Sequence, residues 1–263
     1  MNDGQISWEI QLSTLNPIIA SGDYIFIIDS GSTDSTLEIA EEYGAKVFIN
    51  EFYSQKQQIN WFLSKNLIPR NSWILRIDAD EYLPFDSILK ISILLSNIDQ
   101  IIGLVYLRLQ RIFHGKHLKY GTLSGRYLPR LWRVGCAEFG TKDMDEKLII
   151  KNGFKLFKAK IDFYDDSLIT PINFVIKHTK YAERQLLDID NGRENKNSLS
   201  KKIYYSLPFE LSVLIMFLYR YVIRLGFLDG RRGLWYHFLQ CFFYRNLIGI
   251  EQEIRNYYKG KNK

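Results

Sequence analysis

Two apolar runs that end in carboxylates constrain the fold of this 263-residue chain more than any other feature. The first run leads into Asp29 and the turn-forming sequence Ser30-Gly31-Ser32, and the second leads into Asp78-Ala79-Asp80 about fifty residues later. Short apolar runs bounded by turn residues are typical of strands buried in the parallel sheet of an α/β fold. Because such sheets bind ligands at the carboxyl ends of their strands, the sequence predicts a ligand site that contains these acids.

Extended and helical patterns alternate along the first part of the chain. This alternation predicts βαβαβ order, a mainly parallel sheet and right-handed crossovers. The expected strands are residues 24–29, 46–50 and 72–78, and the expected helices are residues 35–43 and 55–65.

The later part of the chain is less regular. Residues 101–113 resemble a long strand, and residues 121–166 mix short strands with loops. Helical spacing returns from Pro171, and residues 188–200 are polar and predict a linker or an exposed loop. We therefore expect a catalytic domain in residues 1–200 and a helical tail in residues 201–263.

The tail carries most of the net positive charge. Residues 201–263 contain 11 Lys/Arg and 4 Asp/Glu, whereas residues 1–200 contain 24 and 25. The uncharged runs 211–219 and 234–244 are shorter than the roughly 20 residues that a spanning helix needs. Arginines interleaved with aromatic residues are typical of helices that lie on an anionic membrane surface. The alternative is that the aromatic side chains pack onto the catalytic domain.

The cysteines and the N-terminus indicate a cellular compartment. Cys136 and Cys241 are the only cysteines, and their contexts predict neither a disulfide framework nor a zinc site. The first residues lack the basic start and apolar core of a signal peptide. We therefore expect a cytoplasmic protein that binds peripherally to the inner face of the cell membrane.

The acidic motifs resemble those of family 2 glycosyltransferases with the GT-A fold, especially the bacterial subgroup that builds lipopolysaccharide core and related surface glycans. Three more segments fit that subgroup, so the resemblance covers roughly residues 10–245: Gln58-Ile59-Asn60-Trp61, Leu128 to Arg133, and Leu225 to Arg231. The resemblance implies an inverting, metal-dependent transferase. It would move a sugar from a nucleotide-sugar donor to a lipid-linked or lipopolysaccharide-core acceptor.

The same resemblance assigns roles to the acidic motifs. Asp29, with Ser30 and Gly31 beside it, would contact the nucleotide. Asp78 would contact the ribose side of the donor, and Asp80 would bind a Mg²⁺ or Mn²⁺ ion on the diphosphate. Oxygen ligands suit both ions because these are hard cations. Substrate phosphates can complete the metal shell. Alternate side chains of an extended segment share a face, so the two carboxylates of Asp78 and Asp80 are expected to converge.

Further candidates lie outside these motifs. Asn60 matches a position that reaches the nucleotide in relatives, and Arg130, with Arg133 three residues later, could hold the donor diphosphate or a phosphorylated acceptor. Pairing of these arginines with the acidic residues 143–146 is the alternative. For the general base we favour Glu146. Asp145, which occupies the His position of the family motif, is the second candidate, and a solvated acidic turn is the third interpretation.

Family members ordinarily begin with an apolar strand and a turn that cradles the nucleotide base. This chain begins near the end of that turn, with residues 6–19 as the following helix, so we expect the first strand of the sheet to be missing and the donor site to be weakened. A non-catalytic, membrane-associated remnant is therefore one alternative. A nucleotidyltransferase with a similar sheet is another, although its early Gly-rich phosphate loop is absent. We expect no nucleic-acid partner, since the basic tail fits a membrane better.

Overall fold

The computed structural model describes residues 24–70, 72–139, 148–167, 170–190 and 207–261. These residues form two compact units. Of the described residues, a sheet unit takes 24–70, 72–112, 125–139 and 148–167, and a helical unit takes 113–124, 170–190 and 207–261. The predicted helix at residues 6–19, the predicted domain boundary at residue 200 and most of the predicted linker lie outside the described residues.

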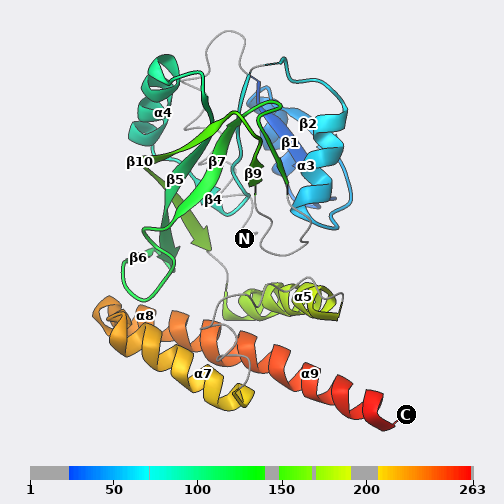
Figure 1. Ribbon diagram of the computed structural model, residues 1–263, viewed down its shortest axis with the longest axis vertical. Coiled ribbons are helices and arrows are strands. Elements are labelled where there is room, and N and C mark those ends of the chain that lie inside the picture. Colours follow the sequence, from blue (N-terminus) through cyan, green and yellow to red (C-terminus); the bar gives the residue numbers. More distant parts are fainter. Residues whose placement is uncertain (1–23, 71, 140–147, 168–169, 191–206, 262–263) are drawn as a thin grey trace. The chain divides into compact units, whose positions relative to one another are not determined.

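The sheet unit contains the strands and helices that the sequence predicted in its first part. Each predicted element between residues 24 and 78 is present, with ends that differ by at most a few residues. The elements are β1 (Phe26–Asp29), α2 (Thr36–Glu42), β2 (Lys46–Ile49), α3 (Gln55–Ser64), β3 (Trp73–Leu75), β4 (Glu81–Tyr82), α4 (Phe85–Asn97), β5 (Ile102–Phe113), β7 (Tyr127–Arg133), β8 (Ala137–Phe139), β9 (Leu148–Ile150) and β10 (Lys155–Ser167) (Figure 1).

Strand pairing corrects the expectation of a mainly parallel sheet. β1 and β2 pair in parallel, but the larger sheet, in the order β3-β7-β5-β10-β4, is antiparallel at β3/β7, β5/β7 and β4/β10. Parallel neighbours need a long crossover, usually a helix, whereas antiparallel strands can follow one another through a hairpin. Residues 114–126 join β5 to β7 without a helix, so this connection favours the antiparallel arrangement.

Helix α4 is an element that the sequence did not lead us to expect. It begins after Pro84, whose extended backbone serves as the N-cap, and Asp86 in its first turn is favourably placed near the positive end of the helix. Ile88 and Ile91 are buried on one face. That face packs near β10, which is itself longer than the short strands expected there.

Two apolar clusters hold the acidic strand ends in place. Ile27 of β1 packs with Ile39 and Ala40 of α2, and Leu104 of β5 packs with Trp132 of β7. Burial of such side chains is the main favourable contribution to folding.

The helical unit contains α5 (Pro171–Asp190), α7 (Phe209–Leu218), the π-helical turn η2 (Tyr219–Ile223), the 3₁₀ turn η3 (Gly226–Asp229), α8 (Gly230–Phe238), the π-helical turn η4 (Leu239–Phe243), α9 (Tyr244–Lys261) and the short strand β6 (Lys116–Leu118) (Figure 1). Ala182 and Leu186 of α5 pack against Ile248 of α9. Phe113 and Leu118 of the β5/β6 hairpin pack against Tyr236 of α8. The hairpin therefore belongs with the helices of the tail.

In the part of the chain that the structure describes, only two helices taken together reach the length needed to span a membrane, and that pair is bent. No single helix there is long and apolar enough to span. Phe209–Ile223 and Gly226–Arg255 qualify together, but they meet at an angle of 70°.

Candidate active site

Helix α3 links the two acidic loops. Ser54, the N-cap of α3, accepts a hydrogen bond from the backbone N–H of Gln57, which fixes the start of the helix. The Gln58 amide donates to Ser30 Oγ at 2.9 Å, and the Gln55 amide donates to Asp78 Oδ2 at 3.3 Å. The loops that follow β1 and β3 are therefore linked through α3, and the ligand site that the sequence predicts there stays a prediction.

Asp29 organises the loop that follows β1. Its Oδ2 accepts the backbone N–H groups of Gly31 at 2.7 Å and Ser32 at 2.8 Å, and its Oδ1 accepts the Ser32 hydroxyl. Burial acts to raise the pKa of Asp29, but these hydrogen bonds outweigh it and keep the pKa below its ordinary value. Asp29 thus has a clear structural role, and its contact with a nucleotide stays a prediction.

Asp78 and Asp80 lie in a turn, not on a continued strand. The Asp78 carbonyl accepts the Glu81 N–H at 2.9 Å, and the Asp80 carbonyl accepts the Asp166 N–H at 2.8 Å. The expectation that an extended backbone aligns the two carboxylates is therefore wrong. The turn also brings Glu81 back, so that its Oε2 accepts the backbone N–H of Asp78 at 3.2 Å.

Two arginines flank the Asp78 carboxylate. Arg76 Nε lies 3.2 Å from Oδ1, and Arg130 Nη2 lies 3.5 Å from Oδ2. Arg76 was missed in the sequence, although it is two residues before Asp78 and two-residue spacing places side chains on one face of a strand. The two positive charges and Gln55 fix the orientation of Asp78.

A buried ion pair lies beneath this turn. Arg130 and Glu81 are 5% and 3% exposed, and the guanidinium donates to Glu81 Oε1 while it covers the ring of Phe163. Burial raises the pKa of Glu81 to about 7, although Arg130 acts in the opposite direction. The contacts give Arg130 a role in holding Glu81 and Asp78. Diphosphate binding by Arg130 stays a prediction.

Arg133 does not lie beside Arg130 on the strand. Residues three apart on a strand face opposite sides of the sheet, and Arg133 lies over the ring of Trp73 and donates to the Ile102 carbonyl at 3.2 Å. Asn60 is exposed, and helical geometry places it about 200° around α3 from Gln58. The structure therefore brings Gln58, and not Asn60, next to Ser30.

Another ion pair borders the buried pair. Arg111 of β5 and Asp165 of β10 are 2.5 Å apart, and Asp165 is the register partner of Glu81 in the β10/β4 ladder. No local pattern predicts this pair, because its members are far apart in the chain and only the sheet brings them together. Glu146 and Asp145, the two candidates for the general base, lie outside the described residues.

The Asp78–Glu81 turn supplies oxygen donors that fit Mg²⁺ or Mn²⁺. Among the described residues, no group of three or more His, Cys, Asp or Glu side chains is arranged to hold a metal. The metal role that the family resemblance gives to Asp80 stays a prediction. Such a site would depend on substrate phosphates for the rest of its ligands.

Comparison with known proteins gives the family. Residues 13–138 match the family description "Glycosyl transferase family 2". Over this stretch, just under half of its length, the chain is similar to family 2 glycosyltransferases. The matched residues include Asp29, Asp78, Asp80 and Arg130, whereas Glu146 follows the match. A fold that mixes α and β elements and continues into a helical region is consistent with the GT-A fold of such a transferase.

Curated proteins that match about a quarter of this chain are also named as glycosyltransferases. An "Uncharacterized glycosyltransferase" of Rickettsia bellii (strain RML369-C) is 39% identical over 69 residues, which are 26% of this chain and 22% of that protein. One of Rickettsia felis (strain ATCC VR-1525 / URRWXCal2) is 43% identical over 61 residues, 23% and 20% of the two chains. The matches thus span about a fifth of the relatives' length.

A solved structure gives a weaker likeness. The crystal structure of S. aureus TarS 1-349 superposes on 96% of this chain and 89% of that chain, with 12% identity and a TM-score of 0.41.

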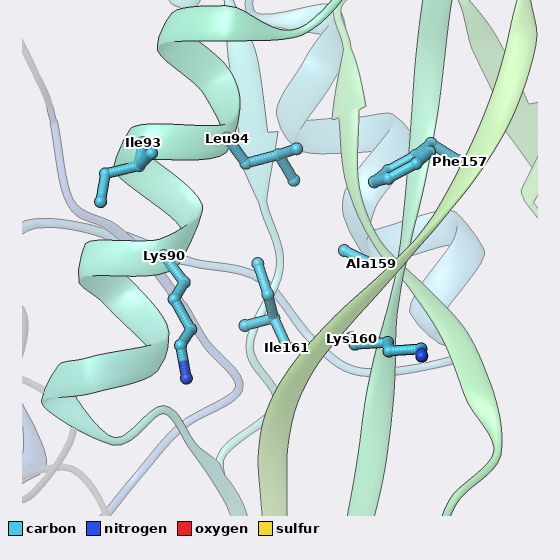
Figure 2. A pocket seen from close by; sticks show the side chains of 7 residues that line it. All are labelled: Lys90, Ile93, Leu94, Phe157, Ala159, Lys160 and Ile161. Carbon is cyan, nitrogen blue, oxygen red and sulfur yellow. The ribbon is translucent and has the colours of Figure 1, made fainter.

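A shallow hollow of about 300 Å³ lies elsewhere in the sheet unit, between α4 and β10 (Figure 2). Apolar side chains line most of it, including Ile93 and Leu94 from α4 and Phe157 and Ile161 from β10. None of its lining residues is a predicted site residue of the transferase, so it is not the candidate active site.

Proposed function

We propose that this protein transfers a sugar, with inversion, from a nucleotide-sugar donor to a lipid-linked or lipopolysaccharide-core acceptor. One observation carries the proposal: α3 joins the Ser30 loop and the Asp78 turn through Gln58 and Gln55, at 2.9 and 3.3 Å. Two loops at strand ends, both within the matched family domain, thereby form one polar site.

The loop after β1 suits an approaching nucleotide. Gly31 has φ +97°, and no described atom lies within 4 Å of the position that a Cβ would take. A glycine in this conformation lets a ligand come close to the backbone. Asp78, whose orientation is fixed by Arg76 and Arg130, would then contact the ribose side of the donor.

Asp80 would hold the divalent metal through its carboxylate. A bound Mg²⁺ or Mn²⁺ ion would supply positive charge to the leaving nucleoside diphosphate. The buried Glu81 keeps the backbone of the turn in place through its bond to the Asp78 N–H. The position of Asp80 therefore depends on the buried side chain of Glu81.

The reaction that we propose is a single displacement. The acceptor oxygen forms a bond to the anomeric carbon, the bond from that carbon to the phosphate oxygen breaks, and its electron pair leaves with the nucleoside diphosphate. The acceptor proton goes to a carboxylate base. Glu146 is our choice for that base and Asp145 is the alternative.

We propose a peripheral location on the cytoplasmic face of the cell membrane, where a lipid-linked acceptor is available. The supporting observation is the composition of the helical unit, in which apolar side chains are exposed next to arginines. The identity of the sugar and of the donor base requires a direct assay.

The test is hydrolysis of a panel of nucleotide sugars by the full chain in the presence of Mg²⁺ or Mn²⁺, followed by transfer to lipid-linked acceptors. We expect one donor to be hydrolysed and the activity to be lost in excess chelator. Asp86→Asn, which changes an exposed acid of α4, is the matched control for acidic substitutions at the site. Absence of hydrolysis and transfer with every donor and acceptor would contradict the proposal and favour a non-catalytic remnant.

A further inference from the structure

Helix α7 and the turn η2 form a continuous helical segment of 15 residues, Phe209 to Ile223, with apolar side chains on nearly every side. Ser212 and Val213 are buried, and α7 contacts α9 and η4. On the outer side, four apolar residues at helical spacing remain between 44% and 47% exposed: Leu211, Leu214, Leu218 and Val222. A helix that faces water normally presents polar residues there, so this stripe requires a different environment.

Exposed apolar side chains also occur in the next turn and on α8. Ile223, which ends η2, is 69% exposed. Five apolar residues of the next turn and of α8 are between 44% and 54% exposed: Leu225, Phe227, Leu228, Trp235 and Phe238. Contiguous apolar patches are uncommon on proteins that remain in water, and they mark contact with membranes or with other proteins.

The turn that carries these side chains is firmly anchored. Leu225 has φ +58°, a conformation that is unusual for a residue other than glycine. Asp229 is buried and accepts the backbone N–H groups of Lys119 and Tyr120 at 3.1 and 2.9 Å, while Lys116 Nζ donates to the Asp229 carbonyl at 2.5 Å. The β5/β6 hairpin therefore holds the turn in a defined shape, with its apolar side chains outward.

Exposed positive charges occur on the same elements as these apolar side chains. Arg224, Arg231 and Arg232 are exposed, and Lys119 adds a further exposed cation from the hairpin. The sequence 209–238 contains only two acids, Glu210 and the buried Asp229. An apolar surface with basic neighbours is complementary to the acyl chains and phosphates of an anionic leaflet.

The dimensions fit one leaflet. Fifteen helical residues extend about 22 Å, which is less than the roughly 30 Å of a hydrocarbon core. The next long helical segment continues at 70°, not along the same axis. An orientation in the plane of the headgroups therefore buries the exposed stripe better than a transmembrane orientation does.

We propose that the surface formed by α7, η2, η3 and α8 inserts into a single leaflet of an anionic phospholipid membrane. This inference deepens the membrane part of the proposed function and rests on it only for its biological purpose. Apolar burial anchors the stripe and the anchored turn, and the flanking arginines select lipid phosphates.

The direct test is co-sedimentation of the full chain with vesicles of phosphatidylcholine alone or mixed with phosphatidylglycerol. The apolar variant Ile223→Asn/Phe227→Asn/Leu228→Asn should bind both vesicles about 100-fold more weakly or worse. The charge variant Arg224→Gln/Arg231→Gln/Arg232→Gln should lose roughly fivefold per arginine, about 100-fold in all, on anionic vesicles at low salt, and much less on neutral ones. The matched control Ile93→Asn/Phe157→Asn, which changes exposed apolar residues of the sheet unit, should bind like the unmodified chain.

Trp235 provides a measurement that needs no destabilising change. Its fluorescence should be quenched by lipids brominated on their acyl chains, and Trp235→Phe should remove most of that quenching. Absence of quenching of the unmodified chain, or equal sedimentation of the apolar variant, would contradict the proposal. Resistance to extraction by alkaline carbonate would indicate an integral segment and overturn the proposal. A dimer that forms without lipid and dissociates in the apolar variant would assign the surface to a second copy, and would overturn the proposal as well.

Donor hydrolysis on the same preparations separates this inference from the proposed function. Vesicle binding without hydrolysis of any donor would contradict the transferase proposal alone. Hydrolysis without vesicle binding would contradict the membrane surface alone. The apolar variant should keep its hydrolysis of a soluble donor, because none of the three residues belongs to the candidate active site.

Discussion

The Arg130–Glu81 pair allows a quantitative test of how the acidic turn is held. Arg130→Met removes the positive charge but keeps most of the apolar bulk, and it leaves Glu81 buried without its partner. Removal of one partner of a buried ion pair costs about 3–5 kcal/mol, whereas exposed pairs contribute about 0–1 kcal/mol. We therefore expect the free energy of unfolding to fall by about 3–5 kcal/mol at pH 8. Lys90→Met, which breaks the exposed pair with Asp86, should change it by less than about 1 kcal/mol.

The pH dependence makes this prediction sharper. The pKa of Glu81 is about 7 in the folded protein, compared with 4.5 for an unperturbed Glu side chain. The native state therefore holds the Glu81 proton more tightly than the unfolded chain does. The contribution of Glu81 to stability is therefore largest at low pH and declines as the pH rises from about 4.5 to about 7. Without Arg130 the folded-state pKa should rise further. The loss caused by Arg130→Met should thus be clearly smaller at pH 5, where Glu81 can be protonated, than at pH 8.

The assay is urea unfolding at pH 5 and pH 8, followed through tryptophan fluorescence, to which Trp73 and Trp132 of the same sheet contribute. Equal losses at both pH values would refute the argument that the burial of an uncompensated carboxylate is the cause. A loss no larger than that of Lys90→Met would refute the importance of the pair itself.

Three further predictions concern the chemistry and the tail. Asp80→Asn should abolish turnover in Mg²⁺ or Mn²⁺ while thermal unfolding is unchanged, and full activity of this variant would reject Asp80 as a metal ligand. Glu146→Gln should lower the transfer rate by roughly 10²-fold or more with little change in donor affinity; if Asp145→Asn does so instead, the base is Asp145. Burial and the nearby Arg220 lower the pKa of His237 to about 4. The native state therefore binds a proton at His237 less tightly than the unfolded chain does, and stability should fall as the pH is lowered from 6.5 to 4. In His237→Gln this pH-dependent part of the free energy of unfolding, up to about 3 kcal/mol, should disappear from urea unfolding curves. An unchanged pH profile would contradict the role given to His237.

Local sequence determined the elements that carry the site. β1, α2, β2 and α3 are where the sequence predicts them, because apolar periodicity and turn residues act over about ten neighbouring residues. The positions of Asp29 and Asp78 at strand ends follow from the same local signals. The family resemblance, which depends on the order of short motifs, was also available from sequence alone and is confirmed by the family match over residues 13–138.

Tertiary structure decided the contacts between distant segments. The pairing of β7 beside β3 and β5 brings Arg130 to Glu81, which lies 49 residues earlier. The predicted contact of Arg130 with a phosphate stays a prediction. The antiparallel direction of the larger sheet and the pairing of Arg111 with Asp165 depend likewise on how strands assemble. No local pattern specifies such pairings.

The tail shows the same division. Its composition predicted interfacial helices, since aromatic residues and arginines alternate along the sequence itself. The side that remains exposed is decided by packing: Ser212 and Val213 are buried, and the Asp229 carboxylate binds backbone groups of a hairpin about 110 residues earlier. Sequence determines which residues are apolar or charged, whereas the tertiary structure determines which of them are left for a ligand or a membrane, because burial depends on the whole arrangement of neighbouring elements.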